Sequence, residues 1–332
     1  MKFAHIADTH IRNYKYHREY RAVFDQIYDR LKTEQVDYIV HCGDLAHTKT
    51  QLSPEYFDLA TSFLRNLADI APTYIILGNH DGNLKNDDRQ DAITPVIEAL
   101  QHPNLHLLKD SGETRLDSLF CLNVLSVFDR DNWVSPSNKD MVNIALYHGA
   151  IQGCVINDEW SLENGEDDIN IFTDFDFAML GDIHRTQYLD KEQRVWYSGS
   201  TVQQNFGESE LKGYLIWNIH SKEKHNVEKR LFRSPRPFIT IELNKDGTLP
   251  KRDVPRGSRL RLVSRYNLPV AKLKRACDYA QVKWSPYTVS FVNKAAHGSL
   301  SDSGINTMGK AINMRDEKNQ EKFLLQFLES KE

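Results

Sequence analysis

Five short apolar runs in this chain each end in a cluster of polar residues. The runs cover residues 3–7, 38–40, 74–77, 144–146 and 175–180. The clusters that end them are Asp8-Thr9-His10, Gly43-Asp44, Gly78-Asn79-His80-Asp81, Tyr147-His148-Gly149 and Gly181-Asp182-Ile183-His184. Short apolar runs that end in Gly, Asp, Asn or His are typical of buried strands that continue into loops. The chain is therefore predicted to fold around buried strands.

The polar clusters are predicted to converge. In open sheets, ligands bind beyond the carboxyl ends of the strands, so distant pieces of chain can meet at one edge. The site would combine carboxylates, imidazoles and one amide, a mixture that suits transition metals better than calcium or zinc–thiolate chemistry. A single Gly-Asp turn is more often ordinary loop chemistry. The ordered set of five clusters predicts a metal site.

Amphipathic segments lie between the early runs. Residues 18–31 place Val23, Ile27 and Leu31 at fourfold spacing, which is typical of a helix. Ser53 and Pro54 have the N-cap and first-turn signals of a second helix. A third helix is expected after Gly82, interrupted near Pro95, and strand patterns dominate from about residue 120. This alternation predicts an α/β fold with two packed mixed sheets flanked by helices.

The ordered clusters resemble those of the calcineurin-like metallophosphoesterases, and three segments resemble the SbcD-type nuclease branch of that superfamily. The segments are Gly43-Asp44-Leu45-Ala46-His47, residues 181–187, and the stretch that joins residues 197–201, Phe206-Gly207-Glu208 and Lys212-Gly213-Tyr214. The resemblance covers residues 1 to about 220 closely and the remainder loosely, and the whole chain is similar to the recombination endonuclease subunits of T-even phages. It implies a four-layer αββα metallophosphoesterase sandwich.

The resemblance also implies a site with two divalent metal ions, Mn²⁺ foremost and Mg²⁺ as the alternative. One ion would be held by Asp8, His10, Asp44 and His184, and the other by Asp44, Asn79, His148 and Asp182. Asp44 would bridge them. Asp182 is a departure, because the nuclease branch usually has His there; it leaves metal preference open, and a turn residue without a ligand role is the alternative.

Two further histidines have roles implied by the resemblance. His80 matches the non-ligand histidine, whose role would be to protonate the leaving oxygen or to hold the phosphate. His47 occupies the place from which an Asp of the Gly-Asp block orients this imidazole in related phosphatases, and a loop histidine of no role is the alternative. Asp81 is expected to orient its loop through backbone hydrogen bonds rather than to bind metal.

Charge is distributed unevenly along the chain. Residues 229–275 contain 14 Lys or Arg and three acidic residues, a net charge of +11. Residues 276–332 have a net charge of zero. Because the whole chain has a net charge of −4, the first 228 residues have a net charge of −15. An acidic body followed by a basic segment fits a polyanion substrate, and a solvated charged surface is the alternative. Arg256, Arg259 and Arg261 are predicted to bind DNA.

Three domains are predicted: a nuclease domain at 1–233, a small basic α/β domain that caps DNA at 234–292, and a linker with a partner-binding helix at 293–332. The Pro-rich stretch at 234–237 suggests the first boundary, and a Gly-, Ser- and Asn-rich segment indicates the linker. The last helix would gather Phe323, Leu324, Phe327 and Leu328 on one face. The resemblance favours docking onto an SMC-like coiled-coil ATPase over packing on the chain's own domain.

Hydropathy and cysteine spacing indicate where the protein acts in the cell. No apolar run approaches the roughly 20 residues of a membrane helix, and no secretory signal pattern is present. The four cysteines, Cys42, Cys121, Cys154 and Cys277, have no disulfide or zinc spacing. We expect a cytoplasmic protein, in the host cytoplasm if it is phage-encoded, without membrane partners and with a homodimer possible.

These observations predict a metal-dependent DNA nuclease with exonuclease and endonuclease character, the subunit of a complex for recombination and DNA double-strand-break repair. The first alternative is a phosphatase or phosphodiesterase of the same superfamily. Protein phosphatases are expected to carry Gly-Asp-x-x-Asp-Arg-Gly and Gly-Asn-His-Glu, and this chain has neither. The second alternative is a catalytically weak scaffold for an ATPase, against which the nearly complete ligand set argues.

Overall fold

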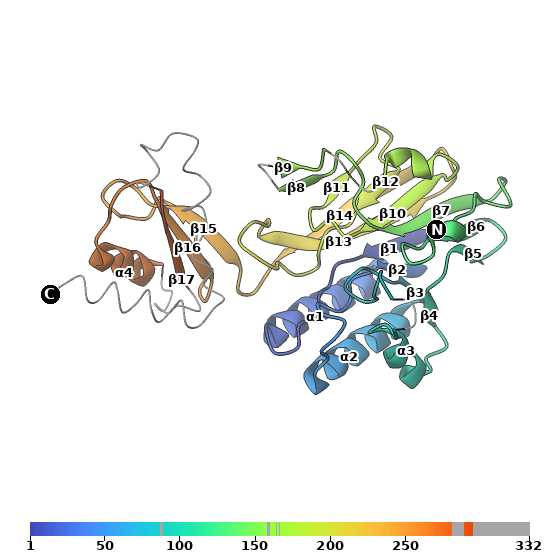
Figure 1. The fold of residues 1–332 in the computed structure, drawn as a ribbon, viewed down its shortest axis with the longest axis horizontal. Coiled ribbons are helices and arrows are strands. Elements are labelled where there is room, and N and C mark those ends of the chain that lie inside the picture. Colours follow the sequence, from blue (N-terminus) through green and yellow to red (C-terminus); the bar gives the residue numbers. More distant parts are fainter. Residues whose placement is uncertain (87–88, 158–159, 164, 166, 281–288, 295–332) are drawn as a thin grey trace. The chain divides into compact units, whose positions relative to one another are not determined.

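The computed structural model describes residues 1–332 except 87–88, 158–159, 164, 166, 281–288 and 295–332. The chain divides into two units, Met1–Ser234 and Pro235–Glu332, which are treated separately below (Figure 1). Almost all of the predicted linker and helix lies outside the described residues. This includes the predicted partner-binding set Phe323, Leu324, Phe327 and Leu328.

The first sheet of unit 1 has six strands in the order β14-β13-β1-β2-β3-β4. Four of them are mutually parallel, namely β1 (Lys2–Ile6), β2 (Tyr38–Cys42), β3 (Thr73–Ile76) and β4 (Leu105–Leu108). An antiparallel hairpin of β13 (Leu211–Ile219) and β14 (His225–Arg233) joins β1 at its free side. The helices α1 (His17–Glu34), α2 (Pro54–Ile70) and α3 (Thr94–Leu100) connect the parallel strands and cover one face (Figure 1).

The second sheet also has six strands, in the order β11-β12-β10-β7-β6-β5. Its central strands are parallel, namely β6 (Phe120–Leu125), β7 (Val142–His148), β10 (Phe177–Gly181) and β12 (Val195–Tyr197). The edge strands β5 (Gly112–Arg115) and β11 (Gln187–Tyr188) are antiparallel to their neighbours. A small hairpin, β8 (Val155–Asn157) with β9 (Trp160–Ser161), and the short helices η1 (Arg130–Asn132) and η2 (Ile169–Phe172) lie in the connections.

Apolar side chains form three layers in unit 1. One layer lies between the helices and the first sheet, and one lies between the two sheets, where Phe3, Trp217 and Phe177 are almost fully buried. The third covers the outer face of the second sheet, where Ile151 and Phe172 from the connections pack on the strands. Alternating side chains of each strand thus face different layers, as the pleat requires. The predicted α/β sandwich of two mixed sheets is confirmed.

The third helix begins later than predicted. The described residues between Gly82 and Ile93 form turns and bends, and α3 begins only at Thr94. Pro95 lies in its first turn, where the missing N–H would have no helical partner. The backbone N–H groups of Ile93 and Thr94 donate instead to the carboxylate of Asp91. The prediction that Pro95 interrupts a helix was wrong, because this proline opens one.

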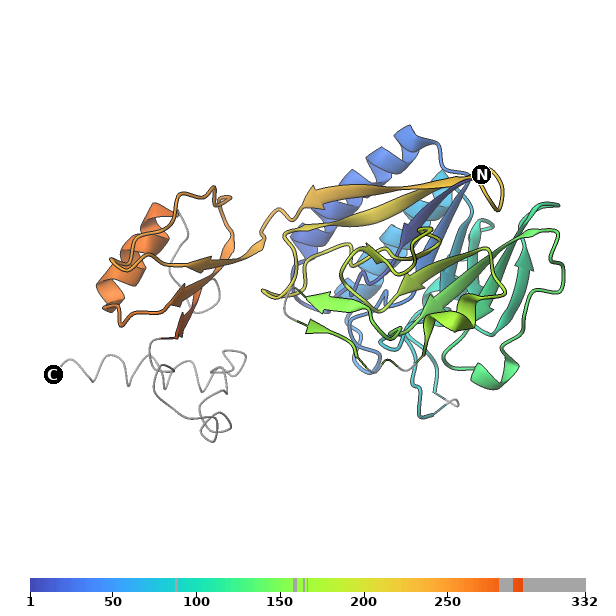
Figure 2. The same ribbon diagram turned by 90° about the horizontal axis from the view of Figure 1, so that it is seen from above.

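Unit 2 contains a three-stranded parallel sheet in the order β15-β16-β17. Its elements are β15 (Phe238–Glu242), β16 (Arg259–Ser264), α4 (Val270–Tyr279) and β17 (Val289–Asn293). The helix packs against one face of the sheet (Figures 1 and 2). Leu273 and Cys277 are buried in one hydrophobic core with Ile239 and Leu262. The small α/β module predicted for this segment is therefore present. In the described part of the chain, no helix combines the length and apolar character needed to cross a membrane.

Candidate metal centre

The predicted ligands lie at the carboxyl ends of five strands, and the structure brings them together. Asp8 and His10 follow β1, Asp44 follows β2, Asn79 follows β3, His148 ends β7, and Asp182 and His184 follow β10. The loops contact one another through their backbones. The N–H of Asp8 donates to the carbonyl of Gly43 at 3.1 Å, and the N–H of His10 donates to the backbone carbonyl of Asp44 at 2.9 Å. Both sheets therefore contribute to one site.

Asp44 faces a histidine from each of two groups of ligand atoms. The side chains of Asp8, His10 and His184 form one group whose ligand atoms lie within 4.8 Å of one another, and those of Asp8, Asp44 and His148 form another. Oδ2 of Asp44 is 3.5 Å from Nε2 of His10, and Oδ1 is 3.4 Å from Nε2 of His148. Its two oxygens thus face one histidine of each group, the arrangement that a bridging carboxylate requires.

Asn79 and Asp182 lie on the side of the site that contains His148. Nδ2 of Asn79 is 3.4 Å from Oδ1 of Asp182, which is 3.8 Å from Nε2 of His148. Oδ1 of Asn79 is buried and has no hydrogen-bond partner among the described residues. A buried acceptor without a donor is costly unless an ion or water satisfies it. This amide oxygen, together with the carboxylates and imidazoles around it, fits divalent metal ions.

The backbone at the site is strained. Four predicted ligands have the left-handed conformation, with φ angles of 51° at Asp8, 48° at His10, 56° at Asp44 and 94° at Asp182. This region is unfavourable for residues with a Cβ atom and persists only where the surrounding structure enforces it. Glycine is required nearby, because a Cβ atom at Gly181 would overlap the carbonyl of Cys42. The left-handed residues thus belong to the loops whose side chains meet at the site.

Asp81 holds two of the loops together. Its Oδ2 accepts hydrogen bonds from the backbone N–H groups of Asp44 at 2.7 Å and Gly78 at 3.0 Å, and its Oδ1 accepts one from Ala46 at 2.8 Å. The carboxylate is fully buried and joins no group of potential metal ligands among the described residues. The prediction that Asp81 orients its loop through backbone hydrogen bonds is confirmed.

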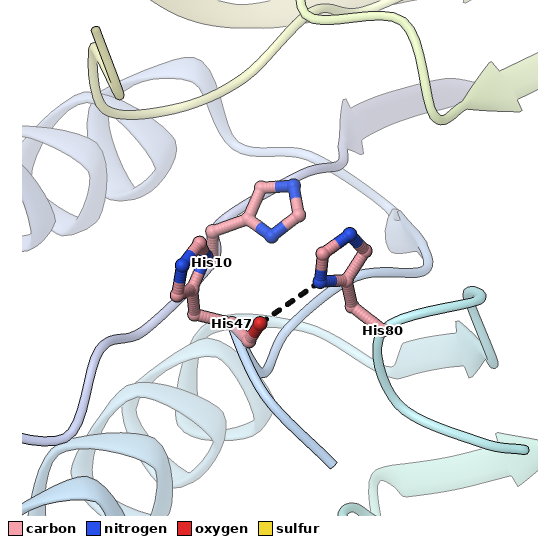
Figure 3. A group of neighbouring side chains, drawn as sticks. All are labelled: His10, His47 and His80. Atoms are coloured by element: carbon pink, nitrogen blue, oxygen red, sulfur yellow. Dashed lines mark hydrogen bonds between the residues drawn. The ribbon is translucent and has the colours of Figure 1, made fainter. Parts of the chain in front are cut away.

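Each of three histidines at the site has its Nδ1 atom engaged away from the centre. Nδ1 of His148 is 2.7 Å from the carbonyl of Cys42, and Nδ1 of His184 is 2.9 Å from Oε1 of Glu208. Nδ1 of His80 is 2.8 Å from the carbonyl of His47 (Figure 3). A ring that donates from Nδ1 leaves the lone pair of Nε2 for a metal or a substrate.

His47 and His80 form a third group with His10. Their ligand atoms also lie within 4.8 Å of one another, and Figure 3 shows the three rings gathered around one space. The rings of His47 and His80 are stacked at a centroid distance of 5.8 Å, and His80 is the exposed member. The structure thus places His80 at the surface of the site, with His47 beside it.

Burial and charge act against each other at this site. Burial raises the pKa of Asp8, since the ionised form loses its hydration. Burial alone would also raise the pKa of Asp44, but the charge and hydrogen bond of His148 and the charge of His10 outweigh it and hold that pKa well below its usual range. Divalent cations would supply the same compensation for these carboxylates more completely than protonated histidines do.

Three residues with contacts to the site had no role in the sequence analysis. Glu208 accepts from His184 and also lies 2.7 Å from Nζ of Lys212. Lys49 donates from Nζ to the carbonyl of Asn79 at 2.8 Å. Glu208 and Lys212 stand in segments that carry the resemblance, so their motif was a signal without an assigned contact. No local pattern identified Lys49.

The predicted DNA-binding residues belong to unit 2 and differ in exposure. Arg256 is exposed, Arg261 is half-buried and Arg259 is buried. The guanidinium of Arg259 donates to the carbonyl of Arg236 at 2.6 Å and lies over the ring of Phe238. Arg259 therefore supports the fold of unit 2, and DNA binding by the three arginines stays a prediction.

Comparison with known proteins gives a family and viral relatives. Residues 1–186 match the sequence model of the family described as calcineurin-like phosphoesterase. The chain is 35% identical over 274 residues to an uncharacterized protein of Acanthamoeba polyphaga mimivirus, a match that covers 78% of this chain and 20% of that protein. It is 26% identical over 203 residues to "Putative phosphoesterase 244L" of Invertebrate iridescent virus 6, covering 58% of this chain and 67% of that protein. The first of these relatives is thus far longer than the matched region.

Proposed function

The chain belongs to the calcineurin-like phosphoesterase family, and on that premise we propose that it is a metal-dependent DNA nuclease of the SbcD type. It would hydrolyse phosphodiesters with exonuclease and endonuclease character during recombination and double-strand-break processing. The observation that carries the proposal is the position of Asp44, whose two oxygens face both halves of a metal centre. A second ground is the basic unit that follows in the same chain.

The residues around Asp44 would hold two divalent metal ions, with Mn²⁺ proposed before Mg²⁺. Bound together, such ions neutralise charge on phosphoryl oxygens and provide a nucleophile at neutral pH. The first ion would be held by Asp8, His10, Asp44 and His184, and the second by Asp44, Asn79, His148 and Asp182. The amide of Asn79 is neutral, so it adds a ligand without adding negative charge toward an anionic substrate. The left-handed loops fix these side chains before the substrate arrives.

His80 is the proposed general acid. Its ring is exposed, and its Nδ1 lies 2.8 Å from the carbonyl of His47, which fixes the ring orientation. When the ring is protonated on both nitrogens, Nε2 would donate a proton to the leaving oxygen or hold the phosphate. His47 would act on His80 as a positioning residue through this hydrogen bond.

DNA is favoured as the substrate by the charge of unit 2. Residues 235–280 contain 11 Lys or Arg and four acidic residues. A basic module has an evident use in holding a polyanion, whereas a small-molecule phosphodiesterase has no need of one. Within the set predicted from the sequence, Arg256 is the best candidate for a phosphate contact, because Arg259 is buried in the fold of its own unit.

The assembly is proposed on the resemblance to SbcD-type nucleases. The partner would be an SMC-like ATPase with a long coiled coil, bound through the apolar face of Phe323, Leu324, Phe327 and Leu328. These residues lie outside the described part of the chain, so the interaction and the place of action in the host cytoplasm stay predictions.

Cleavage of end-labelled DNA in the presence of Mn²⁺ or Mg²⁺ tests the proposal, with a chromogenic phosphodiester as a parallel substrate. We expect metal-dependent cleavage of both. Arg256→Ser should weaken DNA binding and lower its salt dependence, since each lost phosphate contact reduces counterion release, while the small substrate is cleaved as before. Arg65→Ser, an exposed arginine on α2, is the matched control.

Two outcomes would contradict the nuclease proposal. Hydrolysis of the chromogenic substrate without cleavage of DNA, even with the ATPase partner present, would favour a small-molecule phosphodiesterase. A wild-type chain that binds metal but hydrolyses neither substrate would favour a scaffold for the ATPase.

A further inference from the structure

A buried carboxylate lies beside the metal centre without a place in the proposed reaction. Glu208 belongs to the loop that follows β12, and its side chain is only 9% exposed. An ionised carboxylate at this depth is costly unless charged or hydrogen-bonding partners compensate it. Burial alone would raise the pKa of Glu208, but the hydrogen bond of His184 and the charge of Lys212 lower it to about 2.

One oxygen of Glu208 contacts a predicted metal ligand. Oε1 lies 2.9 Å from Nδ1 of His184. When Nδ1 donates to this carboxylate, the lone pair of the ring lies on Nε2, which is 2.9 Å from Nε2 of His10 in the group that includes Asp8. Histidines that bind metals commonly donate their other N–H in this way, which fixes the tautomer and the ring orientation. Glu208 thus presents Nε2 of His184 to the centre.

The other oxygen of Glu208 is held by a buried lysine. Oε2 lies 2.7 Å from Nζ of Lys212 and accepts the backbone N–H of Gln204 at 3.1 Å. The side chain of Lys212 is 4% exposed, and its Nζ also donates to the carbonyl of His184 at 2.8 Å. The ammonium therefore binds both the carboxylate and the backbone of the residue that this carboxylate orients.

We propose that the buried pair of Glu208 and Lys212 positions His184 for the ion held with Asp8 and His10, and so sets the affinity of that ion alone. The inference rests on the proposed two-metal function. The other ion does not need this pair, because Nδ1 of His148 has the carbonyl of Cys42 as its partner. A pair that served only the fold would affect both ions together.

Calorimetric titration of the full chain with Mn²⁺ tests the proposal in the variant Glu208→Gln. The ammonium of Lys212, the N–H of Gln204 and the hydroxyl of Ser200 all face Oε2 and require an oxygen there. The new amide nitrogen therefore turns toward Nδ1 of His184 and displaces the side-chain amide of Asn205, which donates to Oε1 at 3.0 Å. The contact with Nδ1 forces the ring proton onto Nε2. We expect the affinity of one Mn²⁺ site to fall by about 10- to 100-fold, with the other unchanged. Glu210→Gln, two residues along the chain, should leave both affinities unaltered.

The outcomes separate this role from the function on which it rests. Unchanged affinities in Glu208→Gln would overturn the role and leave the two-metal function standing, and equal loss of both ions would overturn it as well. A wild-type chain without Mn²⁺ binding would overturn both. Nitrogen NMR of the wild-type chain with Zn²⁺ bound is independent of the variant's folding. It should show the proton of His184 on Nδ1, and a proton on Nε2 would contradict the proposal.

Discussion

The two sheets contribute to the metal centre in different ways. The first sheet supplies Asp8, His10 and Asp44 from loops that are strained and hydrogen-bonded to one another, with Asp81 accepting backbone N–H groups from both the β2 and β3 loops. The second sheet supplies His148 and His184, whose rings are oriented by acceptors from elsewhere in the chain. These acceptors are the carbonyl of Cys42, in the first sheet, and the carboxylate of Glu208.

The comparison shows two routes to a preorganised site. In the first sheet the backbone conformation itself aims the ligands. In the second sheet only Asp182 has a left-handed backbone, and the orientation of the His148 and His184 rings depends on partners distant in sequence. Substitutions in the loops of the first sheet should therefore disturb the loop conformation and several ligands together. Substitutions beside the second sheet should act on single side chains.

The largest effect is expected at Asp44, which follows a strand of the first sheet and faces His148 of the second. Asp44→Asn replaces one of the two oxygens that face His10 and His148 with an amide nitrogen, which has no free lone pair to bind a metal ion. Both ions should be lost, and phosphodiester hydrolysis should fall by at least about 10²-fold with the circular dichroism spectrum unchanged. Metal content after dialysis against Mn²⁺ measures this. Asp58→Asn, an exposed carboxylate on α2, should retain both ions. Retention of both ions by Asp44→Asn would refute the bridge.

Substitution of His80, in a loop of the first sheet, tests whether catalysis can be separated from metal binding. His80→Ala should keep both ions and lose turnover by about 10²- to 10⁴-fold, the usual cost of removing a general acid. Steady-state kinetics and metal analysis of the same preparation measure the two quantities. His220→Ala, an exposed histidine, is the control. If metal content falls in parallel with the rate, His80 is a metal ligand and not the general acid.

Substitution of Asp81 tests the hydrogen bonds that join the β2 and β3 loops of the first sheet. In Asp81→Asn one amide nitrogen must face a backbone N–H that donated to the carboxylate, leaving at least one buried N–H of Asp44, Ala46 or Gly78 without an acceptor. The free energy of unfolding should fall by about 1–3 kcal/mol, and Mn²⁺ binding should weaken at both sites. Urea denaturation and calorimetry measure these changes. An unchanged denaturation midpoint would show that the loops hold their shape without this carboxylate.

The effect that is smallest at neutral pH concerns a contact between the sheets. Nε2 of His5, on β1, lies 3.1 Å from the carbonyl of Leu180 on β10, and burial lowers the pKa of His5 to about 3. Burial lowers the pKa of His41 to about 3 as well. An unfolded histidine has a pKa near 6.5, so between these values the unfolded chain binds more protons. Each histidine thus gives its full support to stability above about pH 6.5.

As the pH falls from about 6.5 toward 3, each buried histidine should cost stability by about 1.4 kcal/mol per pH unit. His5→Gln keeps a donor for Leu180 and does not titrate, so its stability should fall less steeply with acidification than that of the wild type. Urea unfolding at pH 7.5, 6 and 5 measures the slopes, with His220→Gln as the control. Identical slopes for wild type and His5→Gln would show that His5 is not the group that titrates.

Several features of the site followed from local pattern alone. The polar clusters and their order were readable because each cluster directly follows a short continuous apolar run, which is typical of a buried strand. The role of Asp81 was also predicted from its place after His80. Pro95 was misread, because the same residue interrupts a helix or opens one according to whether the preceding residues are helical, and the turn fixed by Asp91 settles that.

The sequence by itself determined the α/β class, the polar clusters that meet at the site and the basic character of unit 2, because these depend on residue type and spacing within short segments. Only the tertiary structure decided which oxygen of Asp44 faces which histidine, that Glu208 orients His184 from 24 positions away, and that Arg259 is buried. These contacts join segments that meet only when the two sheets pack and the loops adopt left-handed turns. Spacing along the chain carries no record of such meetings, since they are set by close approach in space.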